Sequence, residues 1–242
     1  GLDYRKSYDL TEQGDKEWKT LRYGCIAGLT DQDLDGFNIF GLICTYFLTY
    51  WPALVERGFI KRIYTPLVRA YPKNAKTDKV KEFYSEKDMH NWLQEIGEVA
   101  YNNKYKPLKY YKGLGTHNPA YGEVDNMFLN INNKIRIYTL DKDAIKNMFV
   151  YYGATPALRK IVLATPVNRE PVDGREIPLS QQFEIDTKLF QRDNILRKLL
   201  SCIDGFVGSR RKVFYTARKV GNREIKVQGL AGETVSKANY HH

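Results

Sequence analysis

The stretch "CIAGLTDQDLDGFNIFG" at residues 25–41 joins a short apolar run, a dense group of acids and the start of a longer apolar run. The acids are three aspartates at alternate positions, Asp31, Asp33 and Asp35. Carboxylates so close together repel one another unless a cation lies among them. The stretch therefore raises the question of which cation it binds.

The residues on either side of the acids indicate where they lie in the fold. We expect a buried strand at 21–29 and a helix from Phe37 to about Trp51, with Gly36 allowing the turn. The second apolar run is hydrophobic on all sides, which is typical of an interior helix. The aspartates would then follow the carboxyl end of a buried strand, where open α/β sheets place their ligands.

Calcium in an EF-hand is the first interpretation to test, because "DQDLDG" matches the opening of such a loop. The EF-hand loop needs a bidentate Glu at its twelfth position, and counted from Asp31 that position is Leu42. The motif also needs a helix before the loop, whereas this segment is strand-like. An EF-hand is therefore excluded.

Magnesium fits the spacing better. In an extended chain Asp31 and Asp33 project to the same side about 7 Å apart, a span that one hydrated ion can bridge. Mg²⁺ takes one or two carboxylates and completes its shell with water and substrate phosphate, as in phosphoryl- and nucleotidyl-transfer sites. The alternative is a solvated acidic loop in which Asp35 caps the helix.

A second motif, "KPLKYYKGLGT" at 106–116, favours a phosphate partner. Glycines let a backbone approach a phosphate closely, and the neighbouring lysines add positive charge. A lone Gly-x-Gly is only weak evidence, but here it occurs together with the aspartates. The candidate residues are Lys112, Gly113 and Gly115.

The charge of the chain also favours a polyanionic partner. Its 38 Lys+Arg and 28 Asp+Glu give a net charge of +10. From residue 190 onward eleven basic side chains stand against four acids, so +7 of that charge lies in the last fifth of the chain. This asymmetry favours nucleic acid before an anionic membrane. A merely soluble basic surface is the alternative.

The C-terminal part of the chain has the pattern of a helical DNA-binding domain. Residues 166–178 carry three prolines and one glycine and predict an inter-domain linker. Two helices around a tight glycine turn are expected after it, with Ser209 capping the second. On that helix Arg211, Tyr215 and Arg218 share one face. This outline is typical of a helix-turn-helix or winged-helix DNA binder.

The cysteines and the apolar runs limit the class of protein. Cys25, Cys44 and Cys202 are odd in number and far apart, so they indicate neither a disulfide framework nor a zinc site, and a reducing compartment fits best. The longest apolar run, at 39–51, has about 13 residues against the roughly 20 needed to cross a bilayer. No signal peptide opens the chain. We therefore expect no membrane partner, and the abrupt ends suggest a piece of a longer protein.

Five motifs in colinear order resemble a known family. "RYGCIAGLTDQDLDGFNIFGL", "GFIKRIYTPLVRAY" and "KYYKGLGT" resemble the Toprim region of the type IIA DNA topoisomerases. "RDNILRKLLSCIDGFVGSRRKV" and "REIKVQGLAG", with the terminal "YHH", resemble the start of that family's DNA breakage–reunion region. The resemblance covers most of the chain, is weakest across about 117–180, and is closer to the eukaryotic and large-DNA-virus branch than to bacterial gyrase.

The resemblance implies a fold and its division. The fold is of the α/β class, with a Toprim-type parallel sheet flanked by helices and then a mainly helical winged-helix segment. The Toprim metal-binding region would occupy 1–150, a linker helix and proline-rich connection 151–180, and the first part of the winged-helix DNA-binding domain 181–242.

The resemblance also implies roles for single residues. Asp31 and Asp33 match the Mg²⁺ ligands, and Asp35 matches an outer or second-metal ligand. Lys112 and His242 match residues near the cleavage centre, so the catalytic set it implies is Asp31, Asp33, Lys112 and His242. The DNA-binding residues it implies are Lys112, Gly113, Gly115, Arg211, Lys212, His241 and His242, and the charge and spacing of the basic helix add Arg210 and Arg218 to them.

This chain departs from the family pattern at two places. Phe37-Asn38 stands where the family has Ser-His, and Val207-Gly208 stands where it has Lys-Pro. The second change removes a lysine that would contact phosphate, and Arg210, where the family has Gln, compensates for it. A divergent, viral member of the family is expected.

The activity implied is that of an ATP-dependent type II topoisomerase. Mg²⁺ is the cofactor, ATP binds elsewhere in the full-length enzyme, and the partners are double-stranded DNA and a second copy of the enzyme. Its location would be the nucleus, or the host cytoplasm or viral factory. The family's catalytic Glu lies upstream of Gly1 and its attacking Tyr downstream of His242, so these 242 residues are expected not to cleave DNA alone.

Two other classes remain open on the sequence. The Toprim pattern also occurs in primases and small nucleases, although the C-terminal helices and "YHH" favour neither. A non-catalytic module that binds nucleic acid by charge would explain the basic tail. It would not explain three clustered acids, which repel phosphate unless a cation is present.

Overall fold

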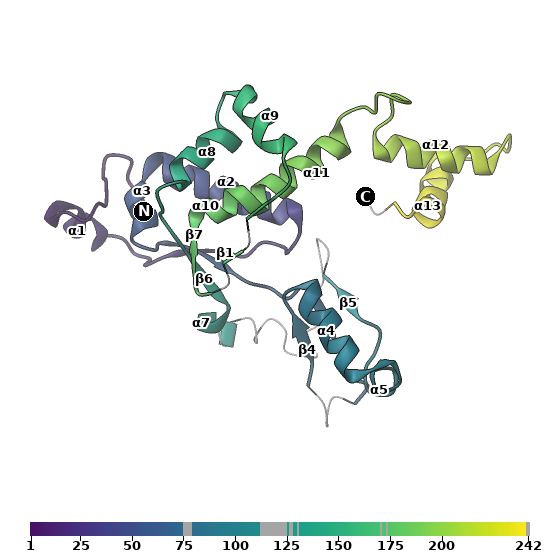
Figure 1. The fold of residues 1–242 in the computed structure, drawn as a ribbon, viewed down its shortest axis with the longest axis horizontal. Coiled ribbons are helices and arrows are strands. Elements are labelled where there is room, and N and C mark those ends of the chain that lie inside the picture. Colours follow the sequence, from purple (N-terminus) through teal and green to yellow (C-terminus); the bar gives the residue numbers. More distant parts are fainter. Residues whose placement is uncertain are drawn as a thin grey trace. The chain divides into compact units, whose positions relative to one another are not determined.

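A computed structural model describes residues 1–74, 79–111, 125, 128–129, 131–169, 171–172 and 174–240. The chain forms two compact units, Gly1–Phe190 and Gln191–His242 (Figure 1). Five predicted site residues lie outside the described residues: Lys112, Gly113, Gly115, His241 and His242.

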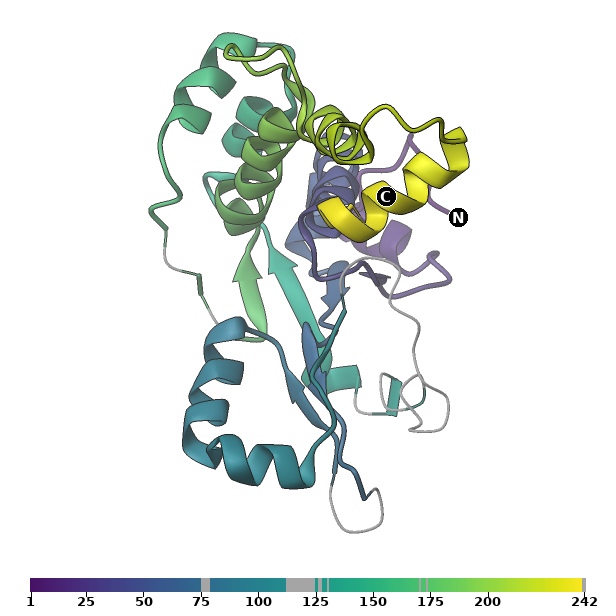
Figure 2. The same cartoon turned by 90° about the vertical axis from the view of Figure 1, so that its right-hand side faces the viewer.

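A four-stranded sheet forms the centre of the first unit. Its strands, in spatial order, are β1 (Ile26–Gly28), β2 (Ile60–Ile63), β6 (Ile135–Thr139) and β7 (Glu176–Pro178). β1 pairs parallel with β2, and β6 pairs parallel with β7, the two running side by side in Figure 2. β2 and β6, however, are antiparallel. The predicted α/β class is confirmed, but the sheet is mixed rather than parallel.

Helices cover one face of this sheet and bury the main core there. They are α2 (Leu34–Tyr50), α8 (Ala144–Tyr152), the short α10 (Leu179–Gln181) and the π-helix η2 (Gln182–Thr187). Phe40 of α2 lies against Gly28 of β1, where a Cβ would come within 2.7 Å of the Phe40 ring. This close contact places the N-terminal turns of α2 directly over the end of β1.

The prediction that α2 is buried all round is wrong. Phe40, Cys44, Phe47 and Leu48 are buried, but a second stripe of apolar side chains is exposed. The sheet and η2 cover only one side of the helix, and the opposite side faces away from them. The exposed stripe consists of Ile39, Leu42, Tyr46 and Tyr50. Across the described part of the chain, no helix is both long and apolar enough to cross a membrane.

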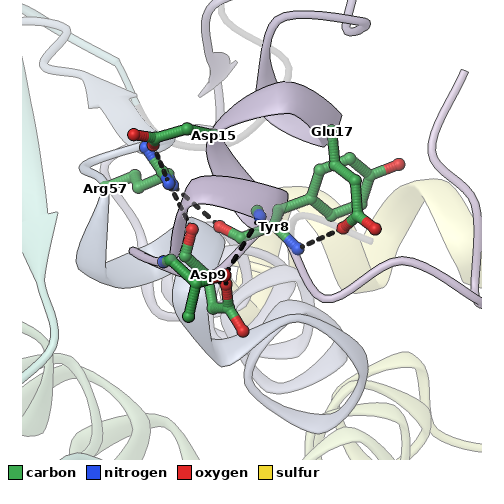
Figure 3. A network of polar contacts seen from close by, with 7 residues as sticks. Tyr8, Asp9, Asp15, Glu17 and Arg57 are labelled. Carbon is green, nitrogen blue, oxygen red and sulfur yellow. Dashed lines mark hydrogen bonds and ion pairs between the residues drawn. The ribbon is translucent and has the colours of Figure 1, made fainter.

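Polar contacts fasten the N-terminal segment to the end of α3 (Pro52–Glu56). Arg57 donates from Nε to the carbonyl of Tyr8 at 2.7 Å and from Nη2 to the carbonyl of Asp9, and it pairs with Asp15 of α1 (Glu12–Trp18) (Figure 3). Glu17 accepts hydrogen bonds from the backbone of Ser7 and Tyr8. The segment before β1 is thereby held on the same core as α2.

A smaller sheet follows β2 along the chain. It has the order β4 (Lys81–Phe83), β3 (Val68–Ala70), β5 (Lys109–Tyr110) and packs against α4 (Glu86–Ile96) and α5 (Glu98–Lys104), as Figure 2 shows. Its core consists of Val68, Ala70, Phe83 and Met89. The short helix α7 (Ile131–Lys134) leads back into β6.

The structure differs from the linker predicted at 166–178. Helix α9 (Pro156–Ala164) is followed by β7, which lies inside that range and joins the central sheet. The division between the two compact units falls later, between Phe190 and Gln191. A proline at the end of β7 is compatible with its edge position, because β7 has a neighbour on one side only among the described strands.

The regular elements described in the second unit are helices joined by turns and loops. Helix α11 (Lys188–Lys198) leads into it, and α12 (Gly208–Val220) packs against α13 (Val227–Ala238). The prediction that Ser209 caps α12 is wrong, because the helix begins at Gly208 and Val207 occupies the N-cap position. The turn before α12 uses Gly205 at a φ of +68°, which favours glycine.

Candidate functional site

The acidic loop, defined here as Leu29–Asp33, connects β1 to α2. Asp33 is the N-cap of α2, and its Oδ1 accepts a hydrogen bond from the backbone N–H of Gly36 at 2.7 Å. A Cβ on Gly36 would lie 2.2 Å from the carbonyl oxygen of Asp31, so only glycine fits beside the loop. The helix cap that the alternative interpretation gave to Asp35 is therefore made by Asp33, and Asp35 lies in the first turn of α2.

The three carboxylates lie where negative charge is favourable. Asp31 and Asp35 are exposed and Asp33 is half-buried. All three lie at the N-terminus of a helix of 17 residues, whose backbone dipole and free N–H groups stabilise anions there. Asp33 makes no ion pair with a described residue. The loop thus presents exposed carboxylate oxygens on a rigid support.

A buried arginine lies beneath the acidic loop. Arg62 of β2 is fully buried, and its Nη2 donates a hydrogen bond to the carbonyl oxygen of Asp31 at 3.2 Å. Its guanidinium carbon lies 4.8 Å from the ring centre of Phe37 and 5.4 Å from that of Phe40. Arg62 therefore contacts both the loop and the first turns of α2.

The counter-ion of Arg62 comes from a distant part of the sequence. Asp186 of η2 places its Oδ2 3.8 Å from Nη1 of Arg62. Burial raises the pKa of the Asp186 carboxyl to about 6, although the nearby Arg62 opposes this shift. The same burial raises the pKa of the neighbouring Cys44 thiol and Tyr138 hydroxyl well above their usual range. The Cys44 thiol and the Tyr138 hydroxyl are therefore both neutral in the pH range where Asp186 titrates.

Arg62 and Asp186 were not among the site residues predicted from the sequence. In "GFIKRIYT" the alternation of a strand places Arg62 on the same face as Ile60, which is a signal that the arginine is buried. Nothing in "QQFEIDTKLF" indicates that Asp186 faces it, because that contact depends on how η2 packs against the sheet.

The acidic loop suits a largely hydrated cation rather than a closed metal site. Among the described residues no group of three or more His, Cys, Asp or Glu side chains is arranged to enclose a metal. The oxygen donors of Asp31, Asp33 and Asp35 are those that Mg²⁺ prefers, and Mg²⁺ needs only one or two protein carboxylates. Because Asp33 uses Oδ1 to cap α2, its Oδ2 is the oxygen left for a cation.

Two of the predicted DNA-binding residues on α12 are engaged within their own unit. Arg211 makes a two-pronged ion pair with Asp204, at 2.8 Å from each of two guanidinium nitrogens, and this holds the pKa of Asp204 well below its usual range. Lys212 donates to the backbone carbonyl of Asn239 at 2.8 Å, at the end of α13. Lys212 also lies 5.9 Å from the ring centre of Tyr240.

The other two predicted DNA-binding residues on this helix are exposed to solvent. Arg210 and Arg218 are exposed, and neither makes an ion pair with a described residue. Tyr215 is also exposed, on the same face as Arg211 and Arg218. The helix therefore presents a basic and aromatic face.

The segment that leads to Lys112 is held by a buried network in the smaller sheet. Arg69 of β3 is 1% exposed, pairs with Glu82 at 2.9 Å and donates to the hydroxyl of Tyr111 at 3.0 Å. Lys109 lies 4.9 Å from the Tyr111 ring centre. The roles predicted for Lys112 and the two glycines after it stay predictions, because these residues lie outside the described ranges.

A cavity of about 500 Å³ lies elsewhere in the first unit. Its charged lining is paired internally, with Arg169 bound to Glu184 at 2.6 Å and Lys188 bound to Thr165 and the carbonyl of Pro166. None of the predicted site residues lines it.

Known proteins named DNA topoisomerase 2 align with this chain over its whole length. A family model described as the C-terminal associated domain of TOPRIM matches residues 63–181. The DNA topoisomerase 2 of African swine fever virus (isolate Tick/Malawi/Lil 20-1/1983) is 37% identical over 253 residues, covering 100% of this chain and 20% of that protein. DNA topoisomerase 2 of Acanthamoeba polyphaga mimivirus is 30% identical over 297 residues, and mouse DNA topoisomerase 2-beta is 30% identical over 273. These alignments cover 100% of this chain and 22% and 15% of those proteins.

A solved structure has the same fold. The crystal structure of the Plasmodium falciparum topoisomerase II DNA-binding, cleavage and re-ligation domain superimposes with a TM-score of 0.79 at 26% sequence identity, covering 100% of this chain and 32% of that one. The chain spans about a fifth of the length of the viral relatives it matches. Its acidic loop, its mixed sheet and its helical C-terminal unit all fall within this alignment. Over its full length the chain is therefore similar to type IIA DNA topoisomerases, and its residues 63–181 match the domain associated with TOPRIM.

Proposed function

We propose that this chain supplies the metal-binding loop and part of the DNA-binding surface of an ATP-dependent type II DNA topoisomerase. Such an enzyme makes a transient double-strand break and passes a second duplex through it. The observation that carries the proposal is the acidic loop, held at the end of β1 and the N-terminus of α2, in a chain that matches topoisomerases over its full length.

Asp31 and Asp33 would hold Mg²⁺, with Asp35 as an outer or second-metal ligand. When bound, Mg²⁺ stabilises the negative charge that develops on the scissile phosphate and on the leaving sugar oxygen. The chain's own contribution is geometric: the cap from Asp33 and the contact of Gly36 with the Asp31 carbonyl fix the loop before metal and DNA arrive. This preorganisation lowers the free energy needed to order the site on binding.

The basic face of α12 would contact the DNA backbone. Arg210 and Arg218 can reach phosphates without breaking an ion pair with a described residue, whereas Arg211 must share its guanidinium with Asp204. Tyr215 adds a hydrogen-bond donor on the same face. Lys112, Gly113, Gly115, His241 and His242 complete the proposed DNA contacts.

The bond exchange proposed is a reversible transesterification. A tyrosine hydroxyl outside this chain forms a phosphotyrosine bond as the phosphate–sugar bond breaks, and the leaving sugar oxygen takes up a proton. The reverse step restores both bonds, so no high-energy bond is lost. ATP bound by another region would drive strand passage in a homodimer. The enzyme would act in the nucleus, or in the host cytoplasm or viral factory.

Other Toprim enzymes and a non-catalytic nucleic-acid module are less favoured. The relatives named topoisomerase align through the C-terminal helices as well as the acidic loop. A module that binds by charge alone does not need exposed acids beside its phosphate partner.

The test is substitution of Asp31 in the full-length enzyme. Asp31→Asn keeps the loop's shape but removes a charged metal ligand, so DNA cleavage in Mg²⁺ should fall by orders of magnitude while duplex binding stays nearly unchanged. Glu12→Gln, which removes one exposed acid from α1, is the matched control and should cleave normally. Normal cleavage by Asp31→Asn at the wild-type Mg²⁺ concentration would refute the assignment.

A further inference from the structure

We propose that Arg62 is a positioning residue for the acidic loop, locking the loop and the start of α2 to the π-helix η2 so that the loop binds a divalent cation tightly. The inference rests on the proposed function, because it assumes that the acidic loop binds metal. It adds Arg62 of strand β2, which contacts the loop through the backbone carbonyl of Asp31 rather than through a carboxylate.

Three separate elements meet on the Arg62 side chain. One nitrogen, Nη2, donates to the Asp31 carbonyl at 3.2 Å, and the flat guanidinium lies between 4.8 and 5.4 Å from the ring centres of Phe37 and Phe40. Nη1 faces Asp186 of η2 at 3.8 Å. A single planar cation therefore links the loop, the first turns of α2 and the π-helix.

Stability alone does not explain an arginine at this position. Nε and Nη1 of Arg62 have no hydrogen-bond partner among the described residues, although Arg62 is fully buried. Arg136 lies directly opposite it on β6, and like charges facing each other across strands destabilise a sheet. Apolar side chains of similar volume often replace a buried ion pair without loss of stability. What distinguishes Arg62 is its donation to the Asp31 backbone.

The direction in which metal affinity changes when Arg62 is replaced distinguishes a positioning role from a purely electrostatic effect. A positive charge near a cation site repels the cation. If Arg62 acted only through its charge, removing it should therefore strengthen metal binding. If Arg62 instead holds the loop in its binding geometry, removing it weakens metal binding even though a repulsive charge is lost. Residues that orient metal ligands typically change metal affinity by about 10–100-fold when they are substituted.

The experiment measures Mn²⁺ binding to the 242-residue chain by electron paramagnetic resonance, which reports free Mn²⁺ without any need for catalysis. Arg62→Met is expected to weaken Mn²⁺ binding by about tenfold. The matched control is Arg69→Met, which removes another buried, ion-paired arginine that lies in the smaller sheet. Arg69→Met should leave Mn²⁺ affinity unchanged, although it also destabilises the fold.

Arg62→Lys decides the matter if Arg62→Met does not fold. Lysine keeps the charge, so the Coulomb effect is constant, but a single ammonium cannot reproduce the planar fork that contacts the loop and Asp186 together. We expect Arg62→Lys to bind Mn²⁺ more weakly than wild type. Unchanged Mn²⁺ affinity in Arg62→Lys, or tighter Mn²⁺ binding in Arg62→Met, would overturn the positioning role of Arg62 but leave the metal assignment of the acidic loop standing. A wild-type chain that binds no Mn²⁺ would overturn the metal assignment of the proposed function and this inference with it.

Discussion

Asp33 caps helix α2 by accepting a hydrogen bond from the backbone N–H of Gly36 at 2.7 Å. The same residue is a proposed metal ligand, so one carboxylate serves both the helix and the cation. Its two oxygens divide these tasks, because Oδ1 makes the cap and Oδ2 is left for the cation. The two roles can therefore be separated by the choice of substitution.

Asp33→Asn should keep the cap and lose the charged ligand, whereas Asp33→Ala should lose both. Asn is as good an N-cap as Asp, and replacing either by Ala costs about 1 kcal/mol. Urea unfolding in the absence of divalent cations should therefore show Asp33→Ala about 1 kcal/mol less stable than Asp33→Asn. Both variants should bind Mn²⁺ more weakly than wild type. Equal stability of the two variants would contradict the cap.

Gly36→Ala should destabilise the first unit and weaken metal binding together. The added Cβ would lie 2.2 Å from the Asp31 carbonyl, so the loop must move away from α2. Forcing extra volume into a packed site typically costs about 1–3 kcal/mol. The measurement is urea unfolding followed by Mn²⁺ titration. Gly24→Ala is the control, because a Cβ there meets nothing within 4 Å, and it should change neither quantity.

The free energy of unfolding should depend on pH through Asp186, and Asp186→Asn should remove this dependence. Its pKa is raised from 3.8 to about 6 in the folded chain, so the folded state holds the proton more tightly than the unfolded state. Unfolding then releases a proton between about pH 4 and 6, and the stability from this group is present at low pH and lost as pH rises. The shift of about two pKa units corresponds to at most about 3 kcal/mol.

The measurement is urea unfolding of wild type and Asp186→Asn at several pH values from 4 to 7. The free energy of unfolding of wild type, relative to that of the variant, should fall across this range. Burial raises the pKa of the Cys44 thiol and of the Tyr138 hydroxyl well above this range, so neither of these neighbours contributes to the slope. A difference that is flat or rises with pH would show that Asp186 is not protonated more readily in the folded chain.

Asp204→Asn should strengthen DNA binding by releasing Arg211. The ion pair at 2.8 Å occupies the guanidinium, and the carboxylate also repels phosphate. Fluorescence anisotropy with a short duplex over a series of NaCl concentrations should show higher affinity and a salt slope steeper by about 1. Arg218→Ala should change both quantities in the opposite direction. Weaker binding by Asp204→Asn would indicate that Asp204 orients Arg211 for the DNA instead.

Much of the site follows from the local sequence. The order strand, acids, Gly36 and apolar helix is readable in one stretch, because side-chain periodicity and the needs of a tight turn are local properties. The helical C-terminal segment and its basic face are readable for the same reason. The local pattern did not show that Asp33 rather than Asp35 makes the cap, since either carboxylate suits the start of a helix.

Tertiary structure decided the rest. The antiparallel pairing of β2 with β6, the place of β7 in the sheet and the exposed stripe on α2 depend on how distant segments pack, and periodicity carries no information about strand direction. The same holds for Arg62 and Asp186, which meet only because η2 folds against the sheet. A buried charge can be tolerated only where a partner, aromatic rings or a backbone carbonyl is brought to it, and for Arg62 the folded chain brings all three.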